Sequence, residues 1–209
     1  MRQMLAVLTM ATMLIAGAAC QPQSDPQQSS DQGQPQPKPI VVFETNKGAI
    51  VMELEPDLAP ETVQNFLRHV RSSFYDSLTF HRVRPGFMIQ GGRIMPDGRE
   101  RTSTVFPVAN EADNGLTNVR GAVAMARTSD PHSATSEFFI NVVDNPPLDF
   151  KDKTARGFGY AVFGRVVEGM EVADAIAQVP ARRTRNSEAE PIDPVIIFRA
   201  YIREPTTGA

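Results

Sequence analysis

The sequence predicts a mainly β domain, a closed barrel whose ends are covered by two helices. Short runs rich in β-branched and aromatic residues recur between residues 40 and 202, bounded by turn residues. Two further stretches have the apolar spacing of amphipathic helices. There are no internal repeats. Many short strands combined with two helices favour a barrel, although composition alone does not exclude a β-sandwich.

The domain is expected to begin with a hairpin and a helix. Residues 40–45 and 49–55 are β-rich runs joined by Asn46-Lys47-Gly48, which is suited to a tight turn. Pro60 then suits the first position of a helix. Apolar residues follow at i, i+3, i+4 and i+7, so one face of this helix is expected to contact the core. They are Val63, Phe66, Leu67 and Val70.

The later strands are predicted from shorter runs, with one more helix between the last two. The runs cover residues 78–84, 87–90, 120–126, 137–143, 160–166 and 194–202. The helix is expected at about 169–178, with an apolar side formed by Val172, Ala173, Ile176 and Ala177. Because neighbouring residues on a strand face opposite ways, we expect Phe138 in the interior and Phe139 in a partly open cleft.

Charge and motif content argue against several functional classes. The chain has 209 residues and a net charge of −3, which gives no long-range attraction to nucleic acid. A cluster of arginines is followed by Glu188 and Glu190 and is expected to be a solvated loop; it comprises Arg182, Arg183 and Arg185. The three histidines lack metal-ligand spacing, and no phosphate-binding loop is present, so no metal or cofactor is expected.

Residues 1–19 are predicted to be a signal peptide. A positive start is followed by an apolar stretch too short to span a bilayer comfortably. The sequence Ala16-Gly17-Ala18-Ala19-Cys20 resembles a bacterial lipobox, in which Cys20 becomes the lipidated N-terminus. Gly17 departs from the usual leucine, and the preceding residues also suit cleavage for plain secretion. We favour the lipoprotein because Cys20 is the only cysteine, which also excludes an intrachain disulfide.

A linker is expected between this signal and the folded domain. Residues 20–39 hold Cys20 and a Gln/Pro-rich stretch that cannot build a core, so we predict disorder. The domain then covers residues 40–205, and residues 206–209 form a tail. The expected location is the bacterial cell envelope, as a periplasm-facing lipoprotein with the outer membrane favoured. A soluble periplasmic protein is the alternative.

Residues 80–92, FHRVRPGFMIQGG, combine features that indicate a site. Arg82 lies between apolar residues on a strand-like run that Pro85-Gly86 ends with a turn. Three apolar residues follow, then Gln90 and two glycines that let other backbone come close. The pattern predicts a fixed guanidinium at the edge of an apolar patch, with an amide side chain nearby to hold it.

Such a site suits a reaction that needs one well-placed donor in a dry pocket. Rotation about an X-Pro bond is such a reaction, with a barrier of about 18–20 kcal/mol. As the amide twists, its nitrogen gains a lone pair that accepts a hydrogen bond, so a guanidinium aimed there stabilises only the twisted state. One donor of this kind contributes about 3–4 kcal/mol. The pocket must supply the rest by binding the twisted form preferentially.

The motif resembles the signature of the cyclophilin-type peptidyl-prolyl cis-trans isomerases. The stretches NEADNGLTNVRGAVAMARTSDPHSATSEFFINV and FGYAVFGRVVEGMEVADAI extend the resemblance to residues 40–205 and are similar to the bacterial periplasmic branch. The resemblance implies a closed eight-stranded antiparallel barrel capped by two α-helices. It also implies that Arg82 is catalytic and that Gln90 orients its side chain.

The resemblance further implies the substrate-binding residues. The apolar lining of the proline pocket is matched by Phe87, Met88, Phe139 and Leu148. Ala126 and Arg127 lie where the family binds the substrate backbone through its own main chain, and Arg127 replaces the usual asparagine.

Two more positions differ from the family pattern. Glu137 stands where glutamine is usual, so we expect a carboxylate near the cleft that pairs with Arg82 or Arg127 and favours basic substrates. Tyr160 replaces a histidine at the far end of the pocket and still offers an aromatic wall.

Two functional classes follow from these residues. The first is a peptidyl-prolyl cis-trans isomerase that assists the folding of exported proteins, acting on proline-containing polypeptides and unfolded chains. The second is a tethered module that binds proline-containing segments, or acts as a chaperone, with little turnover. An intact Arg82 with Gln90 favours the enzyme, because passive binding does not require them. We expect a monomer held at the membrane by its lipid.

Overall fold

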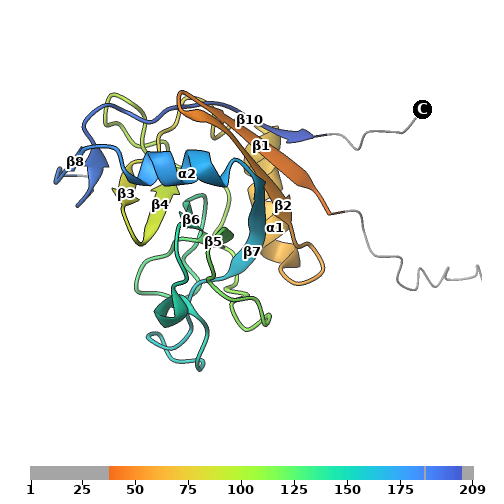
Figure 1. Ribbon diagram of the computed structural model, residues 1–209. Coiled ribbons are helices and arrows are strands. Elements are labelled where there is room, and N and C mark those ends of the chain that lie inside the picture. Colours follow the sequence, from red (N-terminus) through yellow and green to blue (C-terminus); the bar gives the residue numbers. More distant parts are fainter. Residues whose placement is uncertain (1–37, 186, 204–209) are drawn as a thin grey trace, which may run out of the picture. The chain divides into compact units, whose positions relative to one another are not determined.

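The computed structural model describes residues 38–185 and 187–203 (Figure 1). The predictions for the signal peptide, for Cys20 and for most of the linker fall on residues 1–37, outside the described residues. The predicted tail also lies outside them. Among the helices of the described part, none has the length and apolar character needed to cross a membrane.

Eight strands form one antiparallel sheet in the order β10-β1-β2-β7-β5-β6-β4-β3. The predicted hairpin is present, with Ile40 opposite Glu53 and Thr45 opposite Gly48. The strands are β1 (Ile40–Thr45), β2 (Gly48–Leu54), β3 (Arg82–Arg84), β4 (Met88–Gly91), β5 (Ala122–Met125), β6 (Phe138–Asn141), β7 (Val162–Glu168) and β10 (Ile197–Arg203).

The two edges of this sheet are tied together, which closes the barrel. The backbone N–H of Phe80 donates to the carbonyl of Val195 at 2.9 Å, and that of Ile197 donates to Leu78 at 2.8 Å. Thus the segment just before β3 pairs with the start of β10. The predicted strand over residues 78–84 is therefore two pieces, because its first half pairs with residues near 196 and only β3 pairs with β4.

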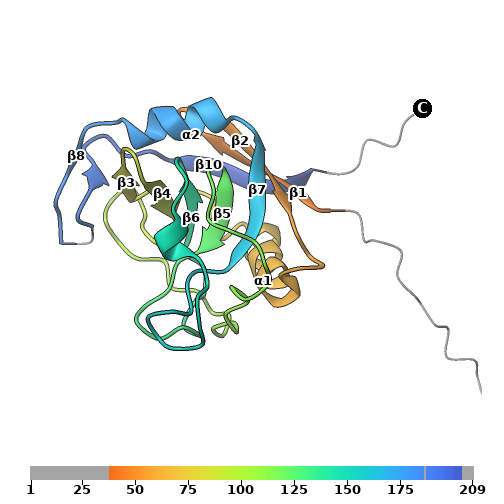
Figure 2. The same cartoon turned by 60° about the horizontal axis from the view of Figure 1, so that its bottom comes forward.

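Two helices cover the barrel, as predicted. They are α1 (Pro60–Arg71) and α2 (Met170–Ala177), and the sheet lies between them in Figure 2. The predicted apolar face of α1 is buried, with Phe66 fully enclosed and in ring contact with Phe43, Phe138 and Phe163. Burying one such ring stabilises the fold by about 1.5–3 kcal/mol.

Two of the three buried hydrophobic clusters in the described residues meet at β6. Phe138 belongs to the main cluster inside the barrel, whereas Phe139 belongs to a smaller cluster with Met88, Ala124 and Val162. The strand alternation therefore placed both phenylalanines correctly. The smaller cluster forms the base of the candidate site.

The three arginines near the end of the chain are exposed to solvent, as predicted, but their segment belongs to a small hairpin rather than to a plain loop. In this hairpin, β8 (Ala181–Arg182) pairs with β9 (Glu190–Pro191). A short 3-10 helix, η1 (Pro146–Leu148), is a second element that the sequence runs did not predict. Both flank the site described next.

Candidate active site

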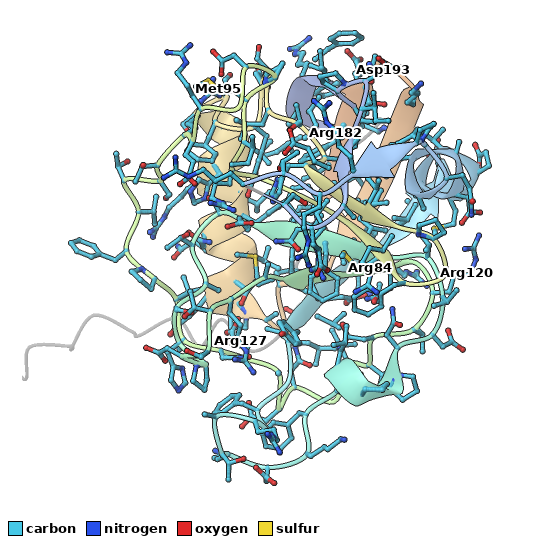
Figure 3. All side chains as sticks on the ribbon, turned by 90° about the vertical axis from the view of Figure 1, so that its left-hand side faces the viewer. Arg84, Met95, Arg120, Arg127, Arg182 and Asp193 are labelled. Carbon is cyan, nitrogen blue, oxygen red and sulfur yellow. The ribbon has the colours of Figure 1, made fainter. Side chains whose placement is uncertain are left out.

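A pocket of about 220 Å³ opens on the face of the barrel formed by β3, β4 and β6. Figure 3 turns toward the viewer the side that carries Arg84, Arg127 and Arg182. Nine of the ten catalytic and substrate-binding residues predicted from the sequence line this pocket. They are Arg82, Phe87, Met88, Gln90, Ala126, Arg127, Phe139, Leu148 and Tyr160.

The base of the pocket is apolar. Met88 and Phe139 are 2% and 4% exposed, and Phe87 and Leu148 pack against the same cluster. The ring of Tyr160 stands edge-on to that of Phe139, with centroids 5.6 Å apart and planes at 82°. Such a hollow fits a small apolar ring, and its low polarity strengthens any hydrogen bond made at its rim.

Arg82 lies directly opposite Gln90 in the pairing of β3 with β4. This register brings the two side chains together, and Nη1 of Arg82 donates to Oε1 of Gln90 at 3.1 Å. The other side of the guanidinium faces Glu188: Nε and Nη2 both donate to its Oε1, at 3.0 and 2.5 Å. The Arg82 side chain is 28% exposed.

The guanidinium retains unused donors. Arginine has five N–H groups, and Gln90 and Glu188 account for three of those of Arg82. Among the described residues, no contact occupies the second N–H of Nη1 or of Nη2. These two groups are therefore available to a ligand in the adjoining pocket.

The contacts of Glu137 differ from the pairing that was expected. Its carboxylate contacts neither Arg82 nor Arg127; instead Oε2 accepts a hydrogen bond from Nε2 of Gln90 at 2.8 Å. The same carboxylate lies 3.2 Å from His81 and 2.8 Å from Arg93. The expected pairing is wrong because these groups already occupy both oxygens.

The charge state of Glu137 follows from these neighbours. Burial acts to raise the pKa of its carboxyl, but the hydrogen bond and charge of His81, the charge of Arg93 and the hydrogen bond from Gln90 together lower the pKa below its ordinary value. Glu137 is therefore an anion at neutral pH and an acceptor. Gln90 must then turn its NH₂ toward Glu137 and its oxygen toward Arg82.

The far wall of the pocket is fixed by the side chain of Arg127. Its Nε donates to the carbonyl of Gly159 at 2.9 Å and Nη2 to that of Ala155 at 3.3 Å. The guanidinium also stacks over the ring of Tyr160, 4.8 Å from its centroid. The N–H of Ala126 donates to the carbonyl of Glu137 at 2.9 Å, so this group is not available to a substrate.

The sequence reasoning missed two charged residues at the site. Glu188 binds Arg82, and Arg84 joins the same carboxylate oxygen at 3.3 Å while its guanidinium lies over the ring of Phe87. Arg84 belongs to the motif and could have been considered. Glu188 is 106 residues from Arg82, and no spacing in the sequence indicates that the two meet.

Within the described ranges, no group of three or more histidine, cysteine, aspartate or glutamate side chains could hold a metal ion. The pocket itself places the side chain of Arg82 beside an apolar hollow.

Comparison with known proteins identifies similar chains over the whole barrel. Residues 40–202 match the family model for cyclophilin type peptidyl-prolyl cis-trans isomerases. The chain is 54% identical to peptidyl-prolyl cis-trans isomerase cyp18 of Streptomyces antibioticus over 162 residues, which cover 78% of this chain and 97% of that one. It is 50% identical to peptidyl-prolyl cis-trans isomerase B of Escherichia coli strain K12 over 165 residues, 79% of this chain and 100% of that one.

Solved structures agree with these sequence comparisons. A crystal structure of a cyclophilin type peptidyl-prolyl cis-trans isomerase from Cryptosporidium parvum superposes with a TM-score of 0.66 at 26% identity. It covers 80% of this chain and 99% of that one. A second structure of that protein, obtained in the presence of the dipeptide Ala-Pro, gives a TM-score of 0.64 at 27% identity, with 79% and 99% covered.

Proposed function

The chain belongs to the family of cyclophilin-type peptidyl-prolyl cis-trans isomerases, and from this premise we propose that Arg82 carries the catalysis at the pocket described above. The protein is an isomerase of X-Pro peptide bonds. The roles of individual residues and the biological setting are our proposals. The single observation that supports the site assignment is a guanidinium with two unused N–H groups beside an apolar hollow.

In the proposed mechanism the pyrrolidine ring enters the hollow formed by Phe87, Met88, Phe139 and Leu148. The planar X-Pro amide offers no basic nitrogen, because its lone pair is delocalised into the carbonyl. As the bond rotates, the nitrogen becomes pyramidal and accepts a hydrogen bond from an unused N–H of Arg82. This interaction exists only near the transition state, so it lowers the barrier without tightening ground-state binding.

The surrounding residues keep this donor in place. Gln90 accepts from Nη1 of Arg82, and Glu137 fixes the orientation of the Gln90 amide. A donor that is already oriented loses no reorganisation energy during the reaction, which is why preorganised groups contribute about 3–4 kcal/mol each.

The first prediction concerns Arg82→Ala. We expect kcat/KM on a proline tetrapeptide to fall by about 10²–10³, the size of one lost transition-state donor. A protease-coupled or NMR exchange assay measures this. Arg165→Ala removes a surface arginine that pairs with Glu53 away from the pocket and serves as the matched control.

A result in which Arg82→Ala is as active as the wild type would remove this mechanism. If the wild type itself bound proline peptides without accelerating their isomerisation, the alternative would hold. The domain would then bind proline-containing segments or act as a chaperone with little turnover.

We also propose that the protein works on exported polypeptides in the bacterial cell envelope. The support is in the sequence: residues 1–19 have the pattern of a signal peptide, and Cys20 ends a lipobox-like stretch. The second prediction is that Cys20→Ser moves the protein from the membrane fraction to the soluble fraction of the producing bacterium. Unchanged fractionation would favour plain secretion.

A further inference from the structure

Glu188 is an acidic residue placed on the guanidinium of Arg82. One carboxylate oxygen, Oε1, accepts hydrogen bonds from both Nε and Nη2 of Arg82, at 3.0 and 2.5 Å. Gln90 contacts the opposite side through Nη1 at 3.1 Å. The guanidinium is therefore held by two partners, and one N–H of Nη1 and one of Nη2 are left without a contact among the described residues.

The backbone next to Glu188 is held against β3. The N–H of Val83, next to Arg82 on β3, donates to the carbonyl of Ala189, next to Glu188, at 2.9 Å. The hairpin also holds itself together, because the N–H of Thr184 donates to the carbonyl of Ser187 at 2.7 Å. Arg82 and Glu188 thus extend from two backbone segments that are bonded to each other at adjacent residues.

A restraint of this kind matters because arginine is a long and flexible side chain. Arg82 is 28% exposed, so without partners its guanidinium would sample several rotamers at the pocket rim. Gln90 alone fixes one nitrogen and leaves the plane of the guanidinium free to turn about that contact. A second partner at Nε and Nη2 removes this freedom.

Glu188 is suited to be that partner. Arg82, through its hydrogen bond and its charge, holds the pKa of the Glu188 carboxyl below its ordinary value, so the side chain is an anion at neutral pH. Arg84 adds a third donor to the same oxygen at 3.3 Å. The carboxylate takes no N–H that Arg82 would need for a substrate, because two remain.

We propose that Glu188 is a positioning residue for isomerisation, which orients the guanidinium of Arg82 so that its unused N–H groups point into the proline pocket. The proposal rests on the catalytic role proposed for Arg82. It assigns to the β8–β9 hairpin a part in the reaction that its arginine-rich sequence does not suggest.

A double-mutant cycle tests the proposal with the purified full chain and a proline tetrapeptide. The variants are Glu188→Ala, Arg82→Ala and the combination of both. We expect Glu188→Ala to lower kcat/KM about ten-fold, mainly through kcat, because a misplaced catalytic group can cost up to about 10²-fold. In the Arg82→Ala background the same change is expected to have no further effect, because there is no guanidinium left to orient.

Glu188→Gln is the conservative variant. Its carbonyl oxygen can accept the same N–H bonds without the charge, so we expect it to recover most of the activity lost in Glu188→Ala. Asp193→Ala, an exposed carboxylate just after β9 that Figure 3 shows apart from Arg84, is the matched control and is expected to retain wild-type kcat. Far-UV circular dichroism and thermal unfolding check that each variant is folded.

Several results would overturn the proposal. Wild-type or increased activity of Glu188→Ala would contradict a positioning role, and equal losses in both backgrounds would indicate a general effect on the fold. Loss of activity in Glu188→Gln as large as in Glu188→Ala would contradict the hydrogen-bond basis. A fully active Arg82→Ala would instead reject the catalytic role proposed for Arg82, so the two failures are distinguishable.

Discussion

Gln90 links two charged groups that have no direct contact with each other. Its oxygen accepts from Arg82, and its NH₂ donates to Glu137, whose second oxygen lies 2.8 Å from Arg93. A glutamine placed between two donors could turn its amide either way, but a carboxylate on one side allows one orientation. Glu137 is therefore linked to Arg82, for which we propose the catalytic role, only through Gln90.

The third prediction is a pH-dependent contribution of Glu137 to stability. Its folded-state pKa is below the ordinary value of 4.5, so the unfolded chain binds the proton more tightly. The stabilisation is therefore fully present above pH 4.5 and is lost as the pH falls through the lower folded pKa. Glu137→Gln is expected to cost about 1.5–3 kcal/mol at neutral pH, because it removes charged hydrogen bonds.

Urea unfolding of wild type and Glu137→Gln between pH 3 and pH 7 measures this difference. The difference in the free energy of unfolding between wild type and Glu137→Gln should become smaller as the pH is lowered. Glu44→Gln changes an exposed carboxylate on β1 and is the control, with little expected effect at any pH. A gap that stays constant from pH 7 to pH 3 would contradict the assignment.

The sequence predicted single residues well where strand alternation or the family motif constrained them. Arg82, Gln90 and Phe139 line the pocket as expected. The pairing of Glu137 was predicted wrongly, because His81 and Arg93 approach it from segments whose packing no local pattern describes. Glu188 could not be predicted at all, since its contact depends on how a distant hairpin packs on β3.

At the scale of elements, the β4 strand ends where another segment comes unusually close. Gly92 has a φ of +101°, and a Cβ atom placed there would lie 2.5 Å from the carbonyl oxygen of Ser136. Ser136 in turn donates its hydroxyl proton to the carbonyl of Gly92 at 2.9 Å. This contact explains the glycine pair at the end of the motif, which the sequence predicted to allow a close backbone approach.

The fourth prediction compares two glycines with positive φ. Gly92→Ala combines backbone strain with a clash against Ser136, so we expect it to lower the free energy of unfolding by more than about 1–3 kcal/mol. Gly115→Ala has a φ of +83° but nothing within 4 Å of the new Cβ, so it carries the strain alone. Chemical unfolding should show the larger loss for Gly92→Ala; equal losses would contradict the clash.

The boundaries of helices and strands were predictable where a regular pattern of apolar residues extended over the whole element. The predicted runs for β1 and β2 begin and end within one residue of the observed strands, and α1 begins at Pro60 as predicted, because a tight turn and the proline mark these boundaries. The run over residues 78–84 was misread as one strand. Its two halves have different hydrogen-bonding partners, and the local composition of a strand does not indicate which segment it pairs with.

At the scale of the whole molecule, closure of the barrel makes the site depend on segments that lie far apart in the sequence. The joining contacts pair residues near 78 with residues near 196, across more than half of the sequence. Composition could not decide between barrel and sandwich, because this long-range pairing is what distinguishes them here. The family resemblance predicted the barrel, and the structure confirms this prediction.

The fifth prediction follows from this closure. Strands β3 and β4, which carry Arg82 and Gln90, are tied to β10 through the closing contacts, so we expect the domain to unfold in one cooperative step. Isomerase activity and far-UV circular dichroism should then be lost at the same urea concentration. Loss of activity well before the loss of secondary structure would show that the site unfolds separately.

The first and last strands of the barrel are direct neighbours, with Ile40 paired to Arg203. In both cartoon views these strand ends lie at the opposite side of the fold from β3 and the β8 hairpin (Figures 1 and 2). A short artificial peptide could join the two ends, and new termini could be opened elsewhere to give a circular permutant. Immobilisation on a bead through a residue at the outer end of β1 or β10 would likewise leave the pocket lined by Arg82 and Phe139 accessible from solution.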